Sequence, residues 1–162
     1  MATESGFPHL RTDVIRKTLA GLPATARGPD SLYAAERDRA TYAALGRSAR
    51  AAAPTGVIVD GTFRRRDDRD AFSAELAATP LVIECVAPEQ TVLARAAARE
   101  RAPQRVSDAG VAVVSGQLGR FEPLDELPAR RHVILRTDRP VGELVSELGP
   151  LVAQRAIASR PR

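Results

Sequence analysis

Short apolar runs alternate along this chain with longer segments in which apolar and polar residues mix. The runs at 57–60 and 81–86 are apolar almost throughout, which is typical of strands buried on both faces of a sheet. Two further runs with strand character begin near residue 8 and at His132. The predicted strands therefore lie near residues 8–12, 57–60, 81–86 and 132–136.

Between these runs the apolar residues recur at helical spacing. The predicted helices lie at residues 13–19, 31–53, 66–78, 88–102, 107–121 and 141–159. Ser107 with Asp108 is expected to cap the fifth of them, and Pro150 to bend or break the last. In the long segment 31–53 the expected buried side consists of Leu32, Tyr33, Tyr42, Leu45 and Ala49, and Gly46 weakens the helix.

Strands that alternate with helices predict an α/β fold in three layers, a parallel sheet with helices on both faces. We expect one domain over residues 1–162. Such sheets bind ligands at the carboxyl ends of their strands. Asp13, Asp60 and Thr137 with Asp138 each follow a predicted strand directly, so the pattern predicts that they meet at one edge.

Composition adds little to this picture. The net charge of the 162 residues is only +4, and Lys17 is the single lysine, so abundant arginine is weak support for a nucleic-acid partner. Cys85 has no second cysteine to pair with and is expected to be a small buried residue of a core strand. There is neither an apolar run long enough to span a membrane nor a signal-peptide core, which predicts a cytoplasmic protein.

One series of segments carries a family resemblance over residues 6–148. It reads HLRTDVIRKTLAGLP, TYAAL, GVIVDGTFRRRDDRDAF, LVIECVAPEQTVLARAAARE, VSDAGVAV and GRFEPLDELPA. In this order it resembles the predicted P-loop kinases, AAA-family ATPases related to zeta-toxin and polynucleotide-kinase-type phosphotransferases. The resemblance implies ATP-dependent phosphoryl transfer to a hydroxyl of a small molecule or nucleotide, with Mg²⁺.

The family pattern places a strand, a G-x-x-x-x-G-K-[ST] loop and a helix before the segment HLRTD. No such series occurs in the sequence, and we expect a P-loop kinase-like fold that lacks its Walker A loop and its first, central strand. Because that loop supplies backbone N–H groups to the phosphates, binding of ATP is expected to be weak and the activity impaired. The resemblance implies the strand order 2-3-1-4-5, so we expect an empty slot between 57–60 and 81–86. Direct pairing of these two strands and self-association through the exposed edges are the alternatives.

The resemblance assigns roles to residues beside the strand ends. Asp13 matches the aspartate that activates the acceptor hydroxyl, and Arg16 a contact to a substrate phosphate. Asp60 matches the catalytic carboxylate that orients Mg²⁺, and Thr62 an acceptor contact. Each has a structural alternative: Asp13 and Thr62 as helix caps, and Asp60 as a turn residue before glycine.

Arginines further along resemble the nucleotide-binding set of nucleoside-monophosphate-type kinases. Arg95 and Arg99 stand four residues apart, on one helical face, where the resemblance places the first on adenine and the second, as a catalytic cation, on the phosphates. Arg105 in the presumed lid and Thr137 complete the expected cofactor site. A solvated arginine stripe paired with glutamates remains the alternative for the helix.

The run Arg64-Arg65-Arg66 has no aromatic platform beside it, and interleaved aspartates offset its charge, which favours a solvated helix start over a nucleic-acid site. Three hypotheses remain: a phosphotransferase, a noncatalytic remnant that binds a partner protein or forms an oligomer, and a basic nucleic-acid-binding module. The sequence favours the first.

Overall fold

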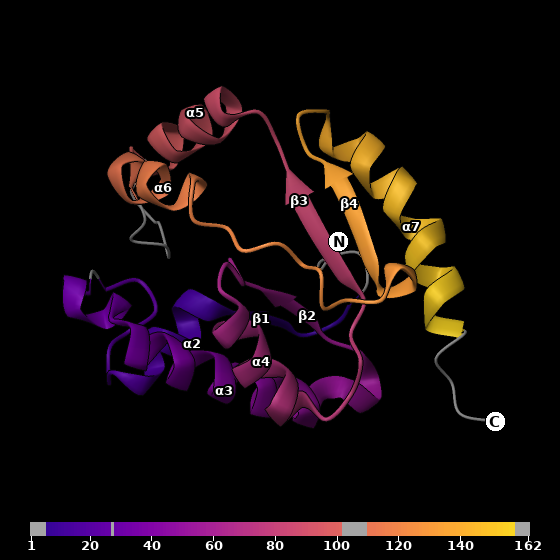
Figure 1. Cartoon of the computed structure of the whole chain (residues 1–162), viewed down its shortest axis with the longest axis horizontal. Coiled ribbons are helices and arrows are strands. Elements are labelled where there is room, and N and C mark those ends of the chain that lie inside the picture. Colours follow the sequence, from indigo (N-terminus) through magenta and orange to yellow (C-terminus); the bar gives the residue numbers. More distant parts are fainter. Residues whose placement is uncertain (1–5, 27, 102–109, 158–162) are drawn as a thin grey trace. The chain divides into compact units, whose positions relative to one another are not determined.

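The computed structural model describes residues 6–26, 28–101 and 110–157. It divides into two compact units (Figure 1). Unit 1 comprises Met1–Ala78 and Leu93–Pro123, and unit 2 comprises Thr79–Val92 and Leu124–Arg162. No helix in the described part of the chain is both long and apolar enough to cross a membrane.

Unit 1 is built on a two-stranded parallel ladder. Strand β1 (His9–Arg11) pairs with β2 (Ile58–Asp60), with Leu10 opposite Val59. The helical elements of this unit are α2 (Thr12–Leu19), η1 (Asp30–Tyr33), α3 (Ala35–Ala52), η2 (Ala53–Thr55), α4 (Arg66–Leu76) and α6 (Val111–Leu118). The chain enters the 93–123 part of the unit along α5 (Glu89–Glu100), whose first turn belongs to unit 2.

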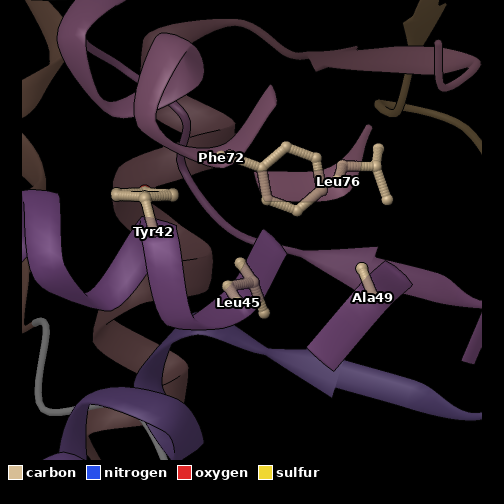
Figure 2. Packing of buried hydrophobic residues seen from close by; sticks show 5 residues of the cluster. All are labelled: Tyr42, Leu45, Ala49, Phe72 and Leu76. Carbon is tan, nitrogen blue, oxygen red and sulfur yellow. The ribbon is translucent and has the colours of Figure 1, made fainter. Parts of the chain in front are cut away.

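The core of unit 1 lies between α3 and α4 (Figure 2). Tyr42, Leu45 and Ala49 follow one another at three- and four-residue intervals on α3, so they share one face of that helix. Phe72 and Leu76 do the same on α4, and all five side chains are buried. Burial of a large apolar side chain contributes about 1.5–3 kcal/mol. This interface therefore holds the polar side chains around it in fixed positions.

Unit 2 has its own parallel ladder. Strand β3 (Val82–Val86) pairs with β4 (His132–Arg136), which follows the short helix η3 (Ala129–Arg131). Helix α7 (Val141–Ile157) runs through Pro150 without a break in its assignment. Leu135 and Leu148 are the buried apolar residues here.

The structure confirms the four predicted strands and their parallel pairing, within one or two residues at each end. The long helix starts later than predicted, because Asp30–Tyr33 forms a separate 3₁₀ turn and Ala34 is extended. Ser107 and Asp108 lie outside the described residues, and α6 begins after the extended Gly110. Strands 57–60 and 81–86 belong to different units. The expected empty slot between these two strands therefore stays a prediction.

Two expectations about burial are wrong. Cys85 is exposed although it lies in β3, so the apolar run around it is not buried on both faces. The start of α4 is not a wholly solvated segment, because Asp68 and Arg69 are 3% and 7% exposed. A run of acidic and basic residues looks solvent-exposed in the sequence. The sequence does not show whether another segment of the folded chain covers it.

Candidate functional site

The carboxyl ends of β1 and β2 are tied to each other by a side chain. Thr12, the first residue of α2, donates a hydrogen bond from its hydroxyl to the carbonyl of Asp60 (2.8 Å). A Cβ atom at Gly61 would lie only 2.1 Å from the Thr12 hydroxyl oxygen, so glycine permits this close approach. The arrangement brings the residues that follow the two strands, Asp13 and Thr62, to the same edge of the ladder.

The Asp60 carboxylate lies at this edge and remains open to solvent. Its side chain is 60% exposed, and the nearby basic side chains are Arg11, with Nε at 3.7 Å, and His9, with Nε2 at 3.9 Å. Pairs this exposed contribute little to stability. Among the described residues, no cluster of three or more His, Cys, Asp and Glu side chains could hold a metal. Asp60 is therefore a single carboxylate available to a ligand.

Arg16 forms the centre of a buried ionic network behind Asp13. One terminal nitrogen of its guanidinium donates to Asp13 Oδ1 (3.0 Å) and the other to Asp38 Oδ1 (2.9 Å). The same group lies over the ring of Tyr33, 4.8 Å from its centre. The side chain is 9% exposed, and its buried Nε has no hydrogen-bond partner within the described part of the chain. Two carboxylates and a ring thus fix one arginine.

This network determines what Asp13 and Arg16 can do. Both terminal nitrogens of Arg16 already donate to a carboxylate, so a substrate phosphate has to share this guanidinium with Asp13 and Asp38. Asp13 uses Oδ1 for Arg16, and its Oδ2 has no hydrogen-bond partner among the described residues. The Asp13 side chain is 24% exposed. A hydroxyl group can therefore approach Asp13 while the network stays intact.

A small cavity lies on the other side of Arg16. Its volume is about 220 Å³, and mainly apolar side chains of α2, η1 and α3 line it. The orphan Nε of Arg16 has almost no accessible surface. Hence the cavity offers this nitrogen no ligand contact, and we assign no ligand to it.

Tyr42 connects the core to the loop after β2. Its hydroxyl accepts a hydrogen bond from the backbone N–H of Phe63 (3.0 Å) and lies 3.1 Å from the hydroxyl of Thr62. Burial raises the pKa of Tyr42, although these two hydrogen bonds act in the opposite direction. Thr62 itself is exposed. Thr62 is therefore exposed to solvent while its hydroxyl contacts the buried hydroxyl of Tyr42.

Asp68 is a second acidic group beside this loop. It is 3% exposed, and burial, followed by the charge of Asp38, raises its pKa above the usual 3.8. The positive charges of Arg65 and Arg64 oppose that shift. This carboxyl group is too deeply buried to contact a substrate directly.

The other predicted site residues are not part of this cluster. Arg95 and Arg99 are exposed residues of α5, on one face because of their spacing. Arg105 lies outside the described residues. In unit 2, the N–H and hydroxyl of Thr137 donate to the carbonyl of Val86 (2.8 and 3.2 Å), which fixes the end of β4 against β3. The structure pairs Asp13 with Arg16, bonds the Asp60 carbonyl to Thr12 and places the Thr62 hydroxyl against Tyr42.

Four buried or bridging residues were missed as parts of the site: Asp38, Tyr42, Asp68 and Arg69. Tyr42 was expected in the core. Because a buried tyrosine hydroxyl needs a hydrogen-bond partner, this hydroxyl could have indicated a polar contact near the site. The acidic pair and Arg69 carry no comparable signal in the sequence. Asp38 bonds Arg16 from twenty-two positions away, and Arg69 bonds Glu122 and Pro123 from more than fifty.

Comparison with known proteins defines the class. The family model described as an AAA domain matches residues 1–124, and the chain belongs to this family. A search of curated proteins gives no match. The structure is similar to the crystal structure of a gluconokinase from Sinorhizobium meliloti 1021, with a TM-score of 0.64 and 19% sequence identity.

That likeness covers 98% of this chain and 86% of the gluconokinase chain. At this identity it shows the fold alone, and the fold is that of a P-loop kinase. Family and fold together support the P-loop kinase-like class expected from the sequence. Kinases of this class generally use a nucleotide and Mg²⁺.

Proposed function

We propose that this chain carries the acceptor side of a kinase-type phosphotransferase, which binds a small molecule or nucleotide through a hydroxyl group at the ends of β1 and β2. The observation that carries the proposal is the Asp13–Arg16–Asp38 network beside Asp60 and Thr62. Asp13, the exposed Thr62 and the exposed Asp60 carboxylate all lie at or just after the ends of these two strands. Such groups recognise hydroxyl-bearing ligands by hydrogen bonds.

In this proposal Asp13 orients the acceptor hydroxyl. Its Oδ2 accepts the hydroxyl proton while Arg16 holds Oδ1 and fixes the plane of the carboxylate. Asp38 balances the charge of Arg16, which leaves Asp13 free to act on the acceptor. Thr62 provides a further hydrogen bond from the end of β2. A polyhydroxylated acid such as gluconate is one acceptor to test, since the similar structure is that of a gluconokinase.

The residues of this chain fit Mg-ATP only in part. Asp60 offers one exposed carboxylate, and Arg95 and Arg99 offer exposed cations, but the sequence has no G-x-x-x-x-G-K-[ST] series for the phosphates. The chain alone is expected to bind Mg-ATP more weakly than about 1 mM, a free energy of about −4 kcal/mol. Titration calorimetry measures this, and a micromolar dissociation constant contradicts it.

The acceptor side is tested by ligand binding and turnover on the full chain. Gluconate, other polyhydroxy acids and nucleosides are titrated by ligand-observed NMR, and ADP release from Mg-ATP is followed with each. We expect Asp13→Asn to abolish acceptor binding or to lower turnover by about 10²-fold or more, as for loss of a general base. Asp70→Asn is the matched control, because Asp70 is 61% exposed and pairs only with Arg66 on α4.

A noncatalytic role is the second candidate, favoured because Arg16 already pairs with two carboxylates. If no acceptor binds and no ADP forms, while Asp13→Asn only lowers the unfolding temperature, the network is a structural element. In that case the chain functions through a partner protein or through self-association.

A further inference from the structure

The loop that carries Asp60 and Thr62 contains a backbone conformation that needs support. Phe63 has a φ of +44°. A bulky residue rarely adopts a positive φ, because its Cβ crowds the backbone, and such conformations persist only where surrounding contacts fix them. Its ring packs between Tyr42 and Phe72, with centroids 4.9 and 5.0 Å away. The ring contacts fix the side chain, and hydrogen bonds must fix the backbone.

Arg69 provides those hydrogen bonds and extends them to a distant segment. It donates to the carbonyls of Phe63 (3.0 Å) and Arg64 (3.3 Å) on the loop. It also donates to the carbonyls of Glu122 (3.2 Å) and Pro123 (2.9 Å), more than fifty positions further along the chain. One buried guanidinium therefore bonds four backbone carbonyls from two segments.

Glu122 joins the same two segments independently. Its N–H donates to the carbonyl of Arg64 (2.9 Å), and its carboxylate accepts the N–H of Arg66 (2.5 Å). Arg66 is the first residue of α4, so a distant carboxylate caps this helix where its own N-cap residue makes no side-chain bond. The loop, the start of α4 and the 122–123 segment are thus connected by neutral and charge-assisted hydrogen bonds.

We propose that Arg69 is a positioning residue: it holds the Asp60–Arg65 loop and the Glu122–Pro123 segment to each other, and so fixes the loop that presents Thr62. The role of Arg69 in acceptor binding rests on the proposed function above. The hydrogen bonds by which Arg69 connects the two segments are independent of that function. Residues 93–123 carry Arg95 and Arg99, so the connection also anchors the end of the segment that bears these cations.

Amide exchange tests the connection without any ligand. The Glu122 amide bonds Arg64 of the loop, and the Phe63 amide bonds the Tyr42 hydroxyl, so residue-resolved exchange by NMR reports each contact separately. In Arg69→Gln we expect the Glu122 amide to exchange about tenfold faster or more, while the Leu45 amide in the core of α3 keeps its protection. Arg47→Gln, in an exposed ion pair with Glu75, is the control and leaves both unchanged.

Tyr42→Phe separates the two contacts, because it removes the acceptor of Phe63 N–H only. It is expected to accelerate exchange at Phe63 and not at Glu122. Arg69→Lys keeps the charge but cannot reach four carbonyls at once, so partial protection at Glu122 is expected; it also replaces Arg69→Gln if that variant does not fold. Unchanged exchange at Glu122 in a folded Arg69 variant overturns the proposal.

A functional readout distinguishes positioning from a purely structural role. For any acceptor that binds in the titrations above, Arg69→Gln should weaken its binding about tenfold, or by about 1.4 kcal/mol, at a temperature where the variant is fully folded. Acceptor affinity that is unchanged while Glu122 exchange is faster shows that Arg69 only stabilises the fold, which also overturns the proposal. Absence of any acceptor rejects the proposed function; the connection of the segments is still judged by exchange.

Discussion

Gly46 is the position where a single methyl group tests the packing of unit 1 most directly. It lies within α3 and faces α4. A Cβ atom there would lie 2.5 Å from the backbone oxygen of Phe72 and 2.9 Å from Glu75 Cβ. Real Cβ atoms do not approach other atoms so closely. Gly46→Ala therefore forces the two helices apart, or shifts the backbone of α4.

Two effects of opposite sign compete in this variant. Alanine in a helix interior is favoured over glycine by about 1 kcal/mol. Forcing an extra methyl group into a packed interface costs about 1–3 kcal/mol, and the upper part of that range applies because a backbone carbonyl cannot rotate away as a side chain does. The expected net loss is about 1–2 kcal/mol in the free energy of unfolding. For a chain of this size it lowers the unfolding temperature by roughly 2–8 °C.

Thermal and urea unfolding followed by circular dichroism measure the loss. Gly116→Ala is the matched control, because Gly116 is also helical, in α6, and a Cβ atom there meets nothing within 4 Å. It should leave stability unchanged or raise it by up to about 1 kcal/mol. A Gly46→Ala protein as stable as the wild type, or more stable, shows that α3 and α4 are not packed as described.

Two further predictions concern Asp68 and Cys85. Burial and then Asp38 raise the pKa of Asp68, so the folded state keeps this proton to higher pH than the unfolded state, and the stability it contributes is lost as pH rises from about 4 through the folded pKa. Asp68→Asn cannot ionise; its unfolding free energy relative to the wild type should rise with pH in urea titrations at pH 4 to 7, and a flat difference contradicts the assignment. Cys85, exposed on β3, should react with a thiol reagent in the native protein within about tenfold of its rate in urea, whereas a rate limited by unfolding would show that it is covered.

The elements of the fold were largely predictable because their signal is local. Apolar runs located the strands, and the spacing of Tyr42, Leu45 and Ala49 located the buried face of α3. The error at Cys85 arose because an apolar run does not specify what covers each face of the strand. In β3 Cys85 is exposed while the other four residues are partly buried, and a five-residue strand is too short for the sequence to single out that position.

The site was predictable only where its partners are close in the sequence or follow a strand. Asp13 and Arg16 are three residues apart on one helix, so their pairing is within reach of spacing rules. Asp38 joins them from α3, twenty-two positions from Arg16, and nothing in its surroundings distinguishes it from Glu36 in the same turn. Only the fold selects between these two acids.

Arg69 shows why the remaining contacts were beyond sequence reasoning. An arginine that pairs with carboxylates requires acidic residues, and their positions can be searched for in a sequence. Arg69 instead bonds carbonyl groups of the backbone, which every residue possesses. In the run from Arg64 to Arg69 the four arginines look equivalent, and their different surroundings come from a segment more than fifty positions away. Because any residue type can supply a backbone carbonyl, the residue types of the partners do not reveal that a buried arginine binds them. Such connections between loops have to be found in the structure.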